Sequence, residues 1–283
     1  MTVKSPLLQG LDTDQEFGRR KATFAEQLIW RACDWSALPQ SLRQKLRKRF
    51  ARKVTGPFDV DFEGMKFRLY PSENYCDRVI FGRRDLPERA EHEALLPLIF
   101  PGMVFVDIGA NVGSYSTFVG TRSLSDLTLL AFEPHPRTHA KLLFNLTANG
   151  LPISNVLNCG VGPERATLKL WSDGGSNIGH TSMLKEGTSN AKVSVDVPVV
   201  PLVDMLTEKG IDNIDLLKID IEGFEDRALA PFFDAASDEL LPRHILIETA
   251  HQHLWERDVL GILRTRGYEQ KFATAENLFM SLG

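Results

Sequence analysis

A short turn near residue 107 carries the residue types that a nucleotide-binding site needs. The segment VDIGANVG follows an apolar run and contains Asp107, Gly109 and Gly113. Glycine lets the backbone approach a ligand closely, and the helix that begins here presents unpaired N–H groups. The G-x-G-x-x-G pattern of dinucleotide-binding enzymes requires glycine where this chain has Asn111 and Ser114. The turn therefore disfavours a dinucleotide pyrophosphate.

The same turn fits D/E-x-G-x-G-x-G, a pattern typical of S-adenosylmethionine (SAM) binding. Asp107, Gly109 and Gly113 match this pattern, and Asn111 replaces the middle glycine. Asn adopts a positive φ angle more readily than most non-glycine residues, so the replacement is mild. The carboxylate of Asp107 suits the zwitterionic methionine part and the sulfonium centre of SAM. The alternative is a tight turn in which Asp107 only caps the helix.

A second acidic residue supports the cofactor hypothesis. Glu133 lies 24 residues beyond Gly109, at the end of the next apolar run, and Pro134 ends that strand. An acidic residue about 20 positions after the glycines commonly binds ribose hydroxyls. Because a glutamate before proline is also common in loops, the support comes from its register with the first turn. His135 is expected at the surface near the cofactor.

A later apolar run, IDLLKIDIEG, ends in three ionisable residues. On an extended strand Lys218, Asp220 and Glu222 project to one side. Such groups are costly at the end of a buried strand unless they are paired or used in function. We expect Asp220 at the centre of the site, Glu222 as a base or substrate ligand, and Lys218 to orient the carboxylates. The alternative is an ion pair that closes the strand.

Weaker candidates for the acceptor side lie elsewhere in the chain. His180, in a glycine-rich loop, can act as a neutral base, and Glu248 ends another apolar run. His251 and His253 follow closely, so a metal site with Glu248 and Asp220 is an alternative. No compact metal motif is present. A metal is therefore not expected, although the alternative stays open.

The elements that position these residues alternate between strands and helices. Apolar runs in MVFVDI, LTLLAF, IDLLKIDI and RHILIET are separated by helical patterns, including those near residues 88–100, 112–121 and 202–209. Further strands are expected in ATLKLW and KVSVDVPVV, and a helix and strand end the chain. This alternation predicts a doubly wound α/β fold with helices on both faces of a mostly parallel sheet. Ligands bind such sheets beyond the carboxyl ends of the strands.

The first hundred residues have a different character. Residues 58–70 alternate apolar and polar side chains around a Glu-Gly pair and predict a hairpin. Residues 41–54 predict an amphipathic helix with a basic face. Its apolar stripe consists of Leu42, Leu46, Phe50 and Val54. Either this helix packs its stripe on the domain, or it contacts an anionic membrane or nucleic acid.

Composition and charge limit the function classes. The 283 residues are 43% hydrophobic, and the net charge of −4 combines +6 in residues 1–60 with −10 in the rest. The acidic main part disfavours nucleic-acid substrates. No apolar run approaches the ~20 residues of a membrane span, no signal peptide is evident, and three distant cysteines predict no disulfides. We expect a cytoplasmic protein whose residues 41–54 can contact a membrane surface.

Five motifs occur in the same order as in the FkbM family of SAM-dependent methyltransferases, which the chain resembles. They are VDIGANVGSYS, AFEPHPRTHAKLLFNLTANGL, NCGVG, VPVVPLVDML and IDLLKIDIEGFE. The resemblance covers about residues 101–250. It implies a seven-stranded class I methyltransferase sheet with an antiparallel last strand. It also implies methylation of a hydroxyl on a sugar, polysaccharide or secondary metabolite, with S-adenosylhomocysteine (SAH) as the product. The chain then divides into an accessory helical and hairpin extension, 1–100, and a catalytic domain, 101–283.

The resemblance also assigns residues to the cofactor. Those around the methionine part of SAM would be Asp107, Gly109, Ala110, Asn111 and Gly113. Glu133 and Pro134 would lie at the ribose, and Asn158 and Cys159 would border the adenine or be ordinary strand-end residues. Two other functions compete with this one: a non-catalytic SAM-fold module that binds a partner through its basic helix, and a nicotinamide-dependent oxidoreductase.

Overall fold

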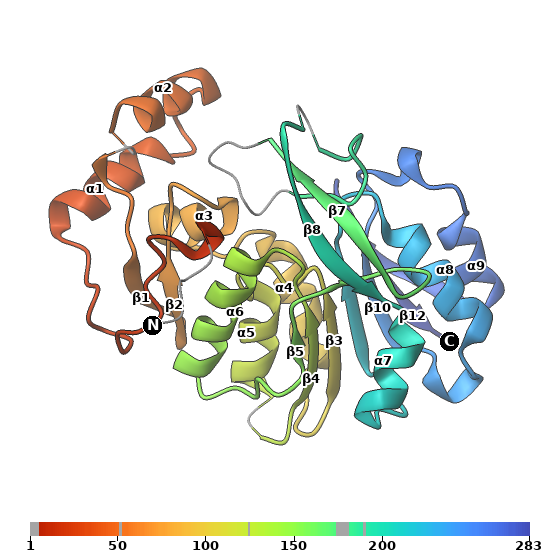
Figure 1. The fold of residues 1–283 in the computed structure, drawn as a ribbon. Helices are drawn as coiled ribbons and strands as arrows, with labels where there is room; N and C mark the ends of the chain where they lie inside the picture. Colours follow the sequence, from red (N-terminus) through yellow and green to blue (C-terminus); the bar gives the residue numbers. More distant parts are fainter. Residues whose placement is uncertain (1–5, 51–52, 124, 174–180, 189–190) are drawn as a thin grey trace.

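A seven-stranded sheet forms the centre of the computed structural model, which describes residues 6–50, 53–123, 125–173, 181–188 and 191–283 (Figure 1). The strand order is β11-β12-β10-β9-β3-β4-β5. The parallel strands are β3 (Val104–Ile108), β4 (Thr128–Phe132), β5 (Val156–Leu157), β9 (Leu216–Ile219) and β10 (His244–Glu248). The last strand, β12 (Asn277–Leu282), runs antiparallel to β10 and to β11 (Tyr268–Ala273). The predicted doubly wound, mostly parallel sheet is confirmed.

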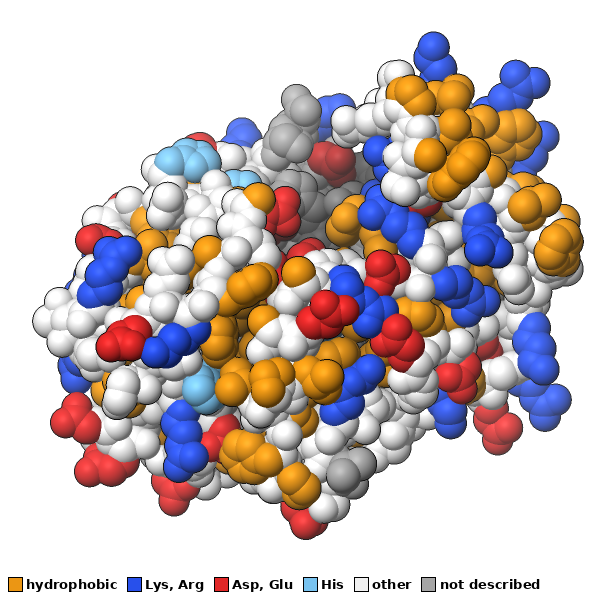
Figure 2. Space-filling model, turned by 180° about the vertical axis from the view of Figure 1, so that it is seen from behind, with side chains coloured by type: hydrophobic (Ala, Val, Ile, Leu, Met, Phe, Trp, Pro, Cys, Tyr) orange, Lys and Arg blue, Asp and Glu red, His pale blue; other side chains and the backbone are white. Residues whose placement is uncertain are grey.

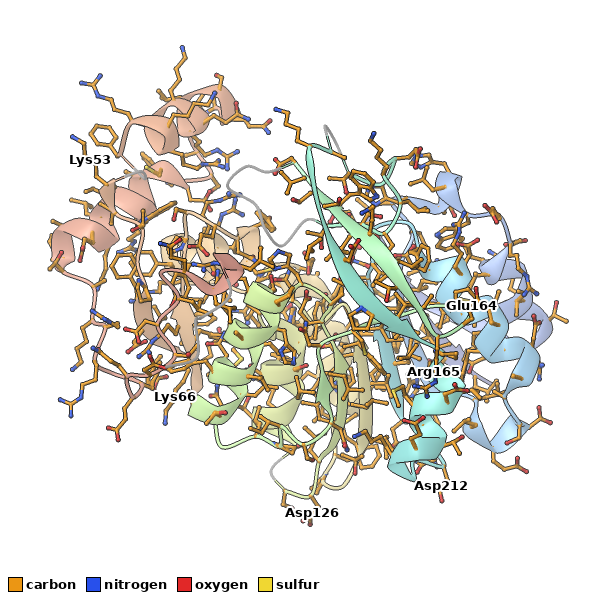
Figure 3. All side chains as sticks on the ribbon, in the orientation of Figure 1. Lys53, Lys66, Asp126, Glu164, Arg165 and Asp212 are labelled. Carbon is orange, nitrogen blue, oxygen red and sulfur yellow. The ribbon has the colours of Figure 1, made fainter. Side chains whose placement is uncertain are left out.

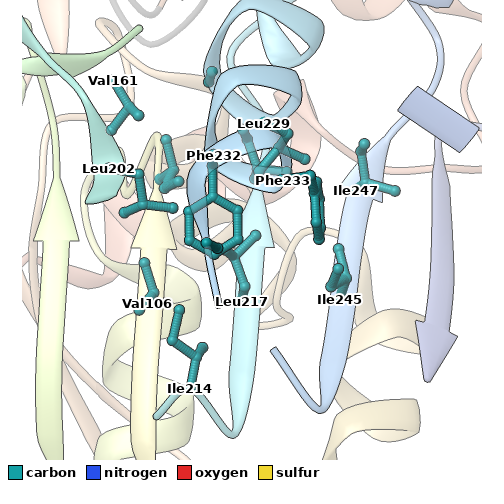
Figure 4. Packing of buried hydrophobic residues seen from close by; sticks show 14 of the residues in the cluster. Val106, Val161, Leu202, Ile214, Leu217, Leu229, Phe232, Phe233, Ile245 and Ile247 are labelled. Atoms are coloured by element: carbon teal, nitrogen blue, oxygen red, sulfur yellow. The ribbon is translucent and has the colours of Figure 1, made fainter. Parts of the chain in front are cut away.

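Helices cover both faces of this sheet, as the alternating pattern predicts. One face is covered by α5 (Ser114–Arg122) and α6 (Pro136–Ala148), and the other by α7 (Leu202–Lys209), α8 (Glu225–Ala235) and α9 (Val259–Thr265). Figure 4 shows Phe232 and Phe233 of α8 packed against Val106, Leu217 and Ile245 of three neighbouring strands. Because both faces of the sheet are buried, the sequences of its strands are continuous apolar runs and do not alternate between apolar and polar residues.

The N-terminal region adds to one of these two cores. The predicted hairpin is present as β1 (Phe58–Phe62) and β2 (Met65–Leu69), and both turn residues between them have a positive φ angle. Trp30 of α1 (Phe24–Cys33) and Phe67 of β2 belong to the same buried cluster as Phe105 of β3. The accessory region therefore shares a hydrophobic core with the sheet.

Two further N-terminal helices, α3 (Tyr75–Arg83) and α4 (Arg89–Leu95), lie between the hairpin and β3. The helix expected over 88–100 is shorter, because α4 gives way to a 3-10 turn at Leu96–Leu98. Pro97 lies in that turn, and proline has no N–H group with which to continue an α-helix.

The amphipathic helix predicted over residues 41–54 is present as α2 (Gln40–Phe50), which ends before Val54. Leu46 and Val54 pack against the core, and the indole N–H of Trp30 donates to the carbonyl of Val54 at 2.9 Å. Leu42 and Phe50, by contrast, are 41% and 40% exposed. The apolar stripe is therefore only partly used in packing.

A small second sheet lies beside the main one. It consists of β6 (Gly160–Val161), β7 (Ala166–Ser172) and β8 (Val193–Val200), in the order β6-β8-β7. The two strands expected in ATLKLW and KVSVDVPVV are present in this sheet as an antiparallel pair. In the ranges that the structure describes, no helix has the length and apolar character needed to cross a membrane.

Candidate active site

A cavity of about 310 Å³ lies beyond the carboxyl ends of β3, β4, β9 and β10. Figure 3 shows Asp126 and Asp212, in the loops that lead into β4 and β9, at the opposite edge of the molecule. The cavity therefore occupies the edge at which open α/β sheets bind ligands. Its lining residues come from the ends of these strands and the turns after them, and from the N-terminal region. Others come from β6, β7, residues 181–183 and the start of β12.

The turn after β3 forms one wall of the cavity. Gly109, Asn111 and Gly113 all have a positive φ angle, at 77°, 51° and 89°. A Cβ atom on Gly109 would lie 2.0 Å from the carbonyl oxygen of Asp220, so no larger residue fits there. Asn111 adopts the left-handed conformation that the sequence pattern requires of it. Gly109, Ala110 and Asn111 line the cavity, whereas Gly113 begins α5 behind it.

Glu133, directly after β4, lies against this turn and lines the cavity. Its two carboxylate oxygens accept the backbone N–H groups of Asn111, at 3.0 Å, and His135, at 2.8 Å. Burial raises the pKa of Glu133 to about 7. Pro134 also lines the cavity. His135 is buried rather than at the surface, so that prediction was wrong: the imidazole packs at the start of α6, and burial lowers its pKa to about 4.

Four of the residues assigned to SAM do not line the cavity: Gly113, at the start of α5, and Asp107, Asn158 and Cys159. Asp107 is fully buried and accepts a hydrogen bond from the Ser116 hydroxyl at 2.5 Å. Asn158 donates from Nδ2 to the carbonyls of Glu133 and Pro134, both at 2.9 Å, and Cys159 is buried beside it. The next two residues, Gly160 and Val161, form the cavity wall on this side.

Among the described residues that line the cavity, Lys218 is the one lysine or arginine, and its side chain is almost completely buried. Its Nζ atom donates to the carbonyl of Gly109 at 3.0 Å and lies 3.6 Å from Asp220 and 3.8 Å from Asp107. Burial opposes its charge, but Asp220, Asp107 and Glu88 outweigh burial and raise the pKa of Lys218. Lys218 therefore ties the turn after β3 to the end of β9.

The predicted strand geometry near Glu222 differs in detail. Strand β9 ends at Ile219, and Glu222 has a φ angle of 56° in the turn that follows. Nevertheless Lys218, Asp220 and Glu222 all line the cavity. An extended strand was expected because the alternation of charged and apolar residues continues past the last strand hydrogen bond.

Glu222, Glu248 and His251 form a second cluster in the cavity wall. The Nδ1 atom of His251 lies 2.6 Å from Glu248 Oε1 and 3.4 Å from Glu222 Oε2, and the Glu222 N–H donates to Glu248 Oε2 at 3.2 Å. Burial and the charges of Asp220, Glu225 and Glu222 raise the pKa of Glu248 well above its usual range. The metal alternative from the sequence included Asp220 and His253, whereas the structure groups Glu222 with Glu248 and His251. His180 lies outside the described residues.

Several cavity residues carry no signal in the sequence. Asn74, Tyr75, Cys76 and Glu88 reach the site from the N-terminal region. The Nδ2 atom of Asn74 donates to Oδ1 of Asn111 at 2.7 Å, and burial, Asp220 and Glu91 raise the pKa of Glu88 to about 8. These contacts join segments that are far apart in the chain, so residue spacing alone cannot predict them.

Comparisons with known proteins identify the family of the chain. The pattern of the methyltransferase FkbM domain matches residues 107–270. Methyltransferase sdnD from Sordaria araneosa is 29% identical over 58% of this chain and 73% of its own length. The 31-O-demethyl-FK506 methyltransferase FkbM from Streptomyces tacrolimicus is 28% identical over 59% of this chain and 73% of its own. The crystal structure of methyltransferase FkbM from Methylobacillus flagellatus KT is similar at a TM-score of 0.45 and 16% identity, over 91% of this chain and 59% of that one. The chain belongs to the methyltransferase FkbM domain family.

Proposed function

We propose that this protein is a SAM-dependent methyltransferase that methylates a hydroxyl oxygen of a sugar, polysaccharide or secondary metabolite. The observation that carries the proposal is the placement of Glu133 across the glycine turn, at the wall of a cavity that also contains a cluster of ionisable groups. A ribose-binding carboxylate and a proton-accepting region thus share one cavity. The relative from Streptomyces tacrolimicus is named for an O-demethyl substrate, which supports an oxygen acceptor.

The residues present fit SAM. Glu133 offers carboxylate oxygens to the two ribose hydroxyls. The turn from Gly109 to Asn111 brings backbone atoms close to the methionine part, with its conformation fixed by the glycine and by the hydrogen bond from Asn74. When bound, SAM supplies an electrophilic methyl group on a sulfonium centre, which an acceptor oxygen takes while the neutral thioether leaves.

The charge of the cavity wall favours a neutral acceptor. Among the described lining residues the acidic ones are Glu88, Glu133, Asp220, Glu222, Glu248 and Glu276, against the single lysine Lys218. Because Lys218 is paired with Asp107 and Asp220, the described lining offers a carboxylate or phosphate no unpaired lysine or arginine next to the reactive methyl group. A hydroxyl carries no such charge, but it has to lose a proton during transfer.

Two groups in the cavity lining can take this proton. Glu222 is 20% exposed in its side chain and lies next to the imidazole of His251. The pKa of Glu88 is raised to about 8 by burial, Asp220 and Glu91, so that this carboxyl titrates close to neutral pH. Asp220, which lines the same cavity, forms an ion pair with Lys218. A nicotinamide-dependent oxidoreductase and a non-catalytic module are weaker alternatives, because neither explains this arrangement.

The acceptor class can be tested with methyl-labelled SAM and matched panels of hydroxyl, carboxyl and amine compounds. We expect label in the hydroxyl panel, in a product that survives mild alkali, because methyl ethers are stable where methyl esters hydrolyse. Label confined to carboxyl or amine compounds would contradict the proposed acceptor while leaving methyl transfer intact. SAH formation measured without any added acceptor gives the background rate, which is subtracted from the rate with each compound.

A further inference from the structure

We propose that Glu222, Glu248 and His251 bind a divalent transition-metal cation at the acceptor end of the cavity. The three side chains come from the turn after β9, the last residue of β10 and the segment just after β10. One ligand atom from each lies within 4.8 Å of the other two, and all three residues line the cavity. Their convergence is therefore compatible with three ligands around one ion.

The donor set indicates which ions fit. Two carboxylates and one imidazole combine oxygen and nitrogen ligands, as Mn²⁺ and Zn²⁺ prefer, whereas Mg²⁺ and Ca²⁺ favour oxygen alone. Three protein ligands leave coordination positions open for an acceptor oxygen, as in catalytic metal sites. The side chains of Glu222 and His251 are 20% and 27% exposed, whereas that of Glu248 is 7% exposed. The site is therefore open to the cavity on the side of Glu222 and His251 and buried on the side of Glu248.

The local charge also favours a cation. Glu222 and Glu248 share one imidazole, since the Nδ1 atom of His251 lies 3.4 Å from Glu222 Oε2 and 2.6 Å from Glu248 Oε1. The one lysine of the described lining, Lys218, is already held by Asp107 and Asp220 on the opposite side. A divalent ion would balance the two glutamates without disturbing this pair. Asp220 lies two residues before Glu222 and lines the same cavity, so the metal and the methyl-transfer centre would be neighbours.

The role of the ion rests on the proposed function, although its binding does not. A metal that contacts the acceptor hydroxyl would polarise the O–H bond and favour the oxyanion. If the chain binds the metal but methylates no hydroxyl, the acceptor proposal fails and the metal site stands. If it methylates a hydroxyl without binding a metal, the metal site fails and the acceptor proposal stands.

The test is direct titration of the metal-stripped, untagged full chain with Mn²⁺ and with Zn²⁺, followed by calorimetry and, for Mn²⁺, by electron paramagnetic resonance. We expect one site per chain, at least about 10-fold weaker in Glu222→Gln and in His251→Asn. His253→Asn is the matched control and should bind like the wild type. Circular dichroism and SAH binding check that each variant is folded. Absence of saturable binding to the wild type, or unchanged binding by both ligand variants, would overturn the site.

A separate surface carries a second proposal. Helices α1 and α2 and the segment that joins them expose large apolar side chains: Phe24 at 81%, Leu28 at 56%, Trp35 at 60%, Leu42 at 41% and Phe50 at 40%. Figure 2 shows hydrophobic and basic side chains gathered over this part of the molecule. Apolar patches of this kind, with basic residues around them, are typical of surfaces that contact a membrane.

The charge of this surface is strongly basic. Helix α2 contains five Lys and Arg residues and no acidic residue. Beneath it the buried carboxylate of Asp34 is shared by Arg47, Arg78 and Arg83, at 3.7, 3.4 and 2.7 Å. One carboxylate cannot balance three guanidinium groups, so the surface keeps a positive excess. We infer that the outer face of α1 and α2 docks on an anionic lipid bilayer.

Vesicle flotation of the full chain tests this docking. We expect flotation with vesicles of phosphatidylcholine and 30–40% phosphatidylglycerol, loss of flotation in high salt, and none with phosphatidylcholine alone. The double variant Lys48→Glu and Arg49→Glu should reduce flotation several-fold, whereas Lys271→Glu, far along the chain in β11, should not. Equal flotation with neutral vesicles, no effect of the double variant, or a dimer that is lost on Trp35→Ser in light scattering would overturn the proposal.

Discussion

Replacing Glu133 by alanine is expected to lower SAM affinity at least about 100-fold. The carboxylate is buried at the cavity wall and already accepts two backbone N–H groups, so its orientation is fixed before the ligand arrives. A hydrogen bond to a charged group contributes about 1.5–3 kcal/mol, and two ribose hydroxyls would make two such bonds. Since about 1.4 kcal/mol corresponds to a factor of ten, the loss should exceed two orders of magnitude. Isothermal titration calorimetry measures it.

The matched control compares the pH dependence of SAM binding in the wild type and in Glu133→Gln. Because burial raises the pKa of Glu133 to about 7, the carboxyl becomes protonated as pH falls through this value. The wild type should therefore bind SAM more weakly at pH 6 than at pH 8, and Glu133→Gln should lack this change. An alanine variant that binds within about threefold of the wild type would remove Glu133 from the ribose site.

Asp220→Asn should retain SAM affinity within about threefold but lose at least about 100-fold in turnover. The amide has almost the same size as the carboxylate, so the turn around Gly109 is preserved. It carries no negative charge, however, and it leaves Lys218 without the carboxylate that lies 3.6 Å away. Loss of one preorganised electrostatic group at a reaction centre typically costs about 10²–10³ in rate. Single-turnover methyl transfer at saturating SAM measures the effect apart from binding.

Asp212→Asn is the control for the loss of one carboxylate. Asp212 lies in the loop before β9, at the edge of the sheet opposite the cavity, and should leave binding and turnover unchanged (Figure 3). If Asp220→Asn kept wild-type turnover, Asp220 would not lie at the centre of the site.

The parts of the site that the sequence predicted are those that local geometry determines. A glycine turn between a buried strand and a helix demands positive φ angles, so Gly109 and Asn111 could be assigned from residue type alone. Glu133 followed from register, because consecutive parallel strands end at the same edge of the sheet. The helices over residues 114–122 and 202–209 followed from their apolar periodicity.

Contacts between distant segments could not be predicted in this way. Glu88 reaches the cavity because the N-terminal helices pack on the same core as β3, and no spacing in the chain indicates this packing. His135 looked like a loop residue because it follows a proline, but tertiary packing buries it. Asp107 was expected beside SAM, whereas its hydrogen bond to Ser116 and its proximity to Lys218 give it a supporting place beneath the turn.

Binding of SAH to the wild-type chain tests the proposed SAM site most directly. Calorimetric titration of the purified full chain should show one SAH per chain, with a dissociation constant between about 1 μM and 1 mM, as is usual for enzyme substrates. NADH and NADPH, titrated under the same conditions, should give no saturable heat. Absence of SAH binding up to millimolar concentration by a folded chain would contradict the assignment of Glu133 and the glycine turn to a SAM site.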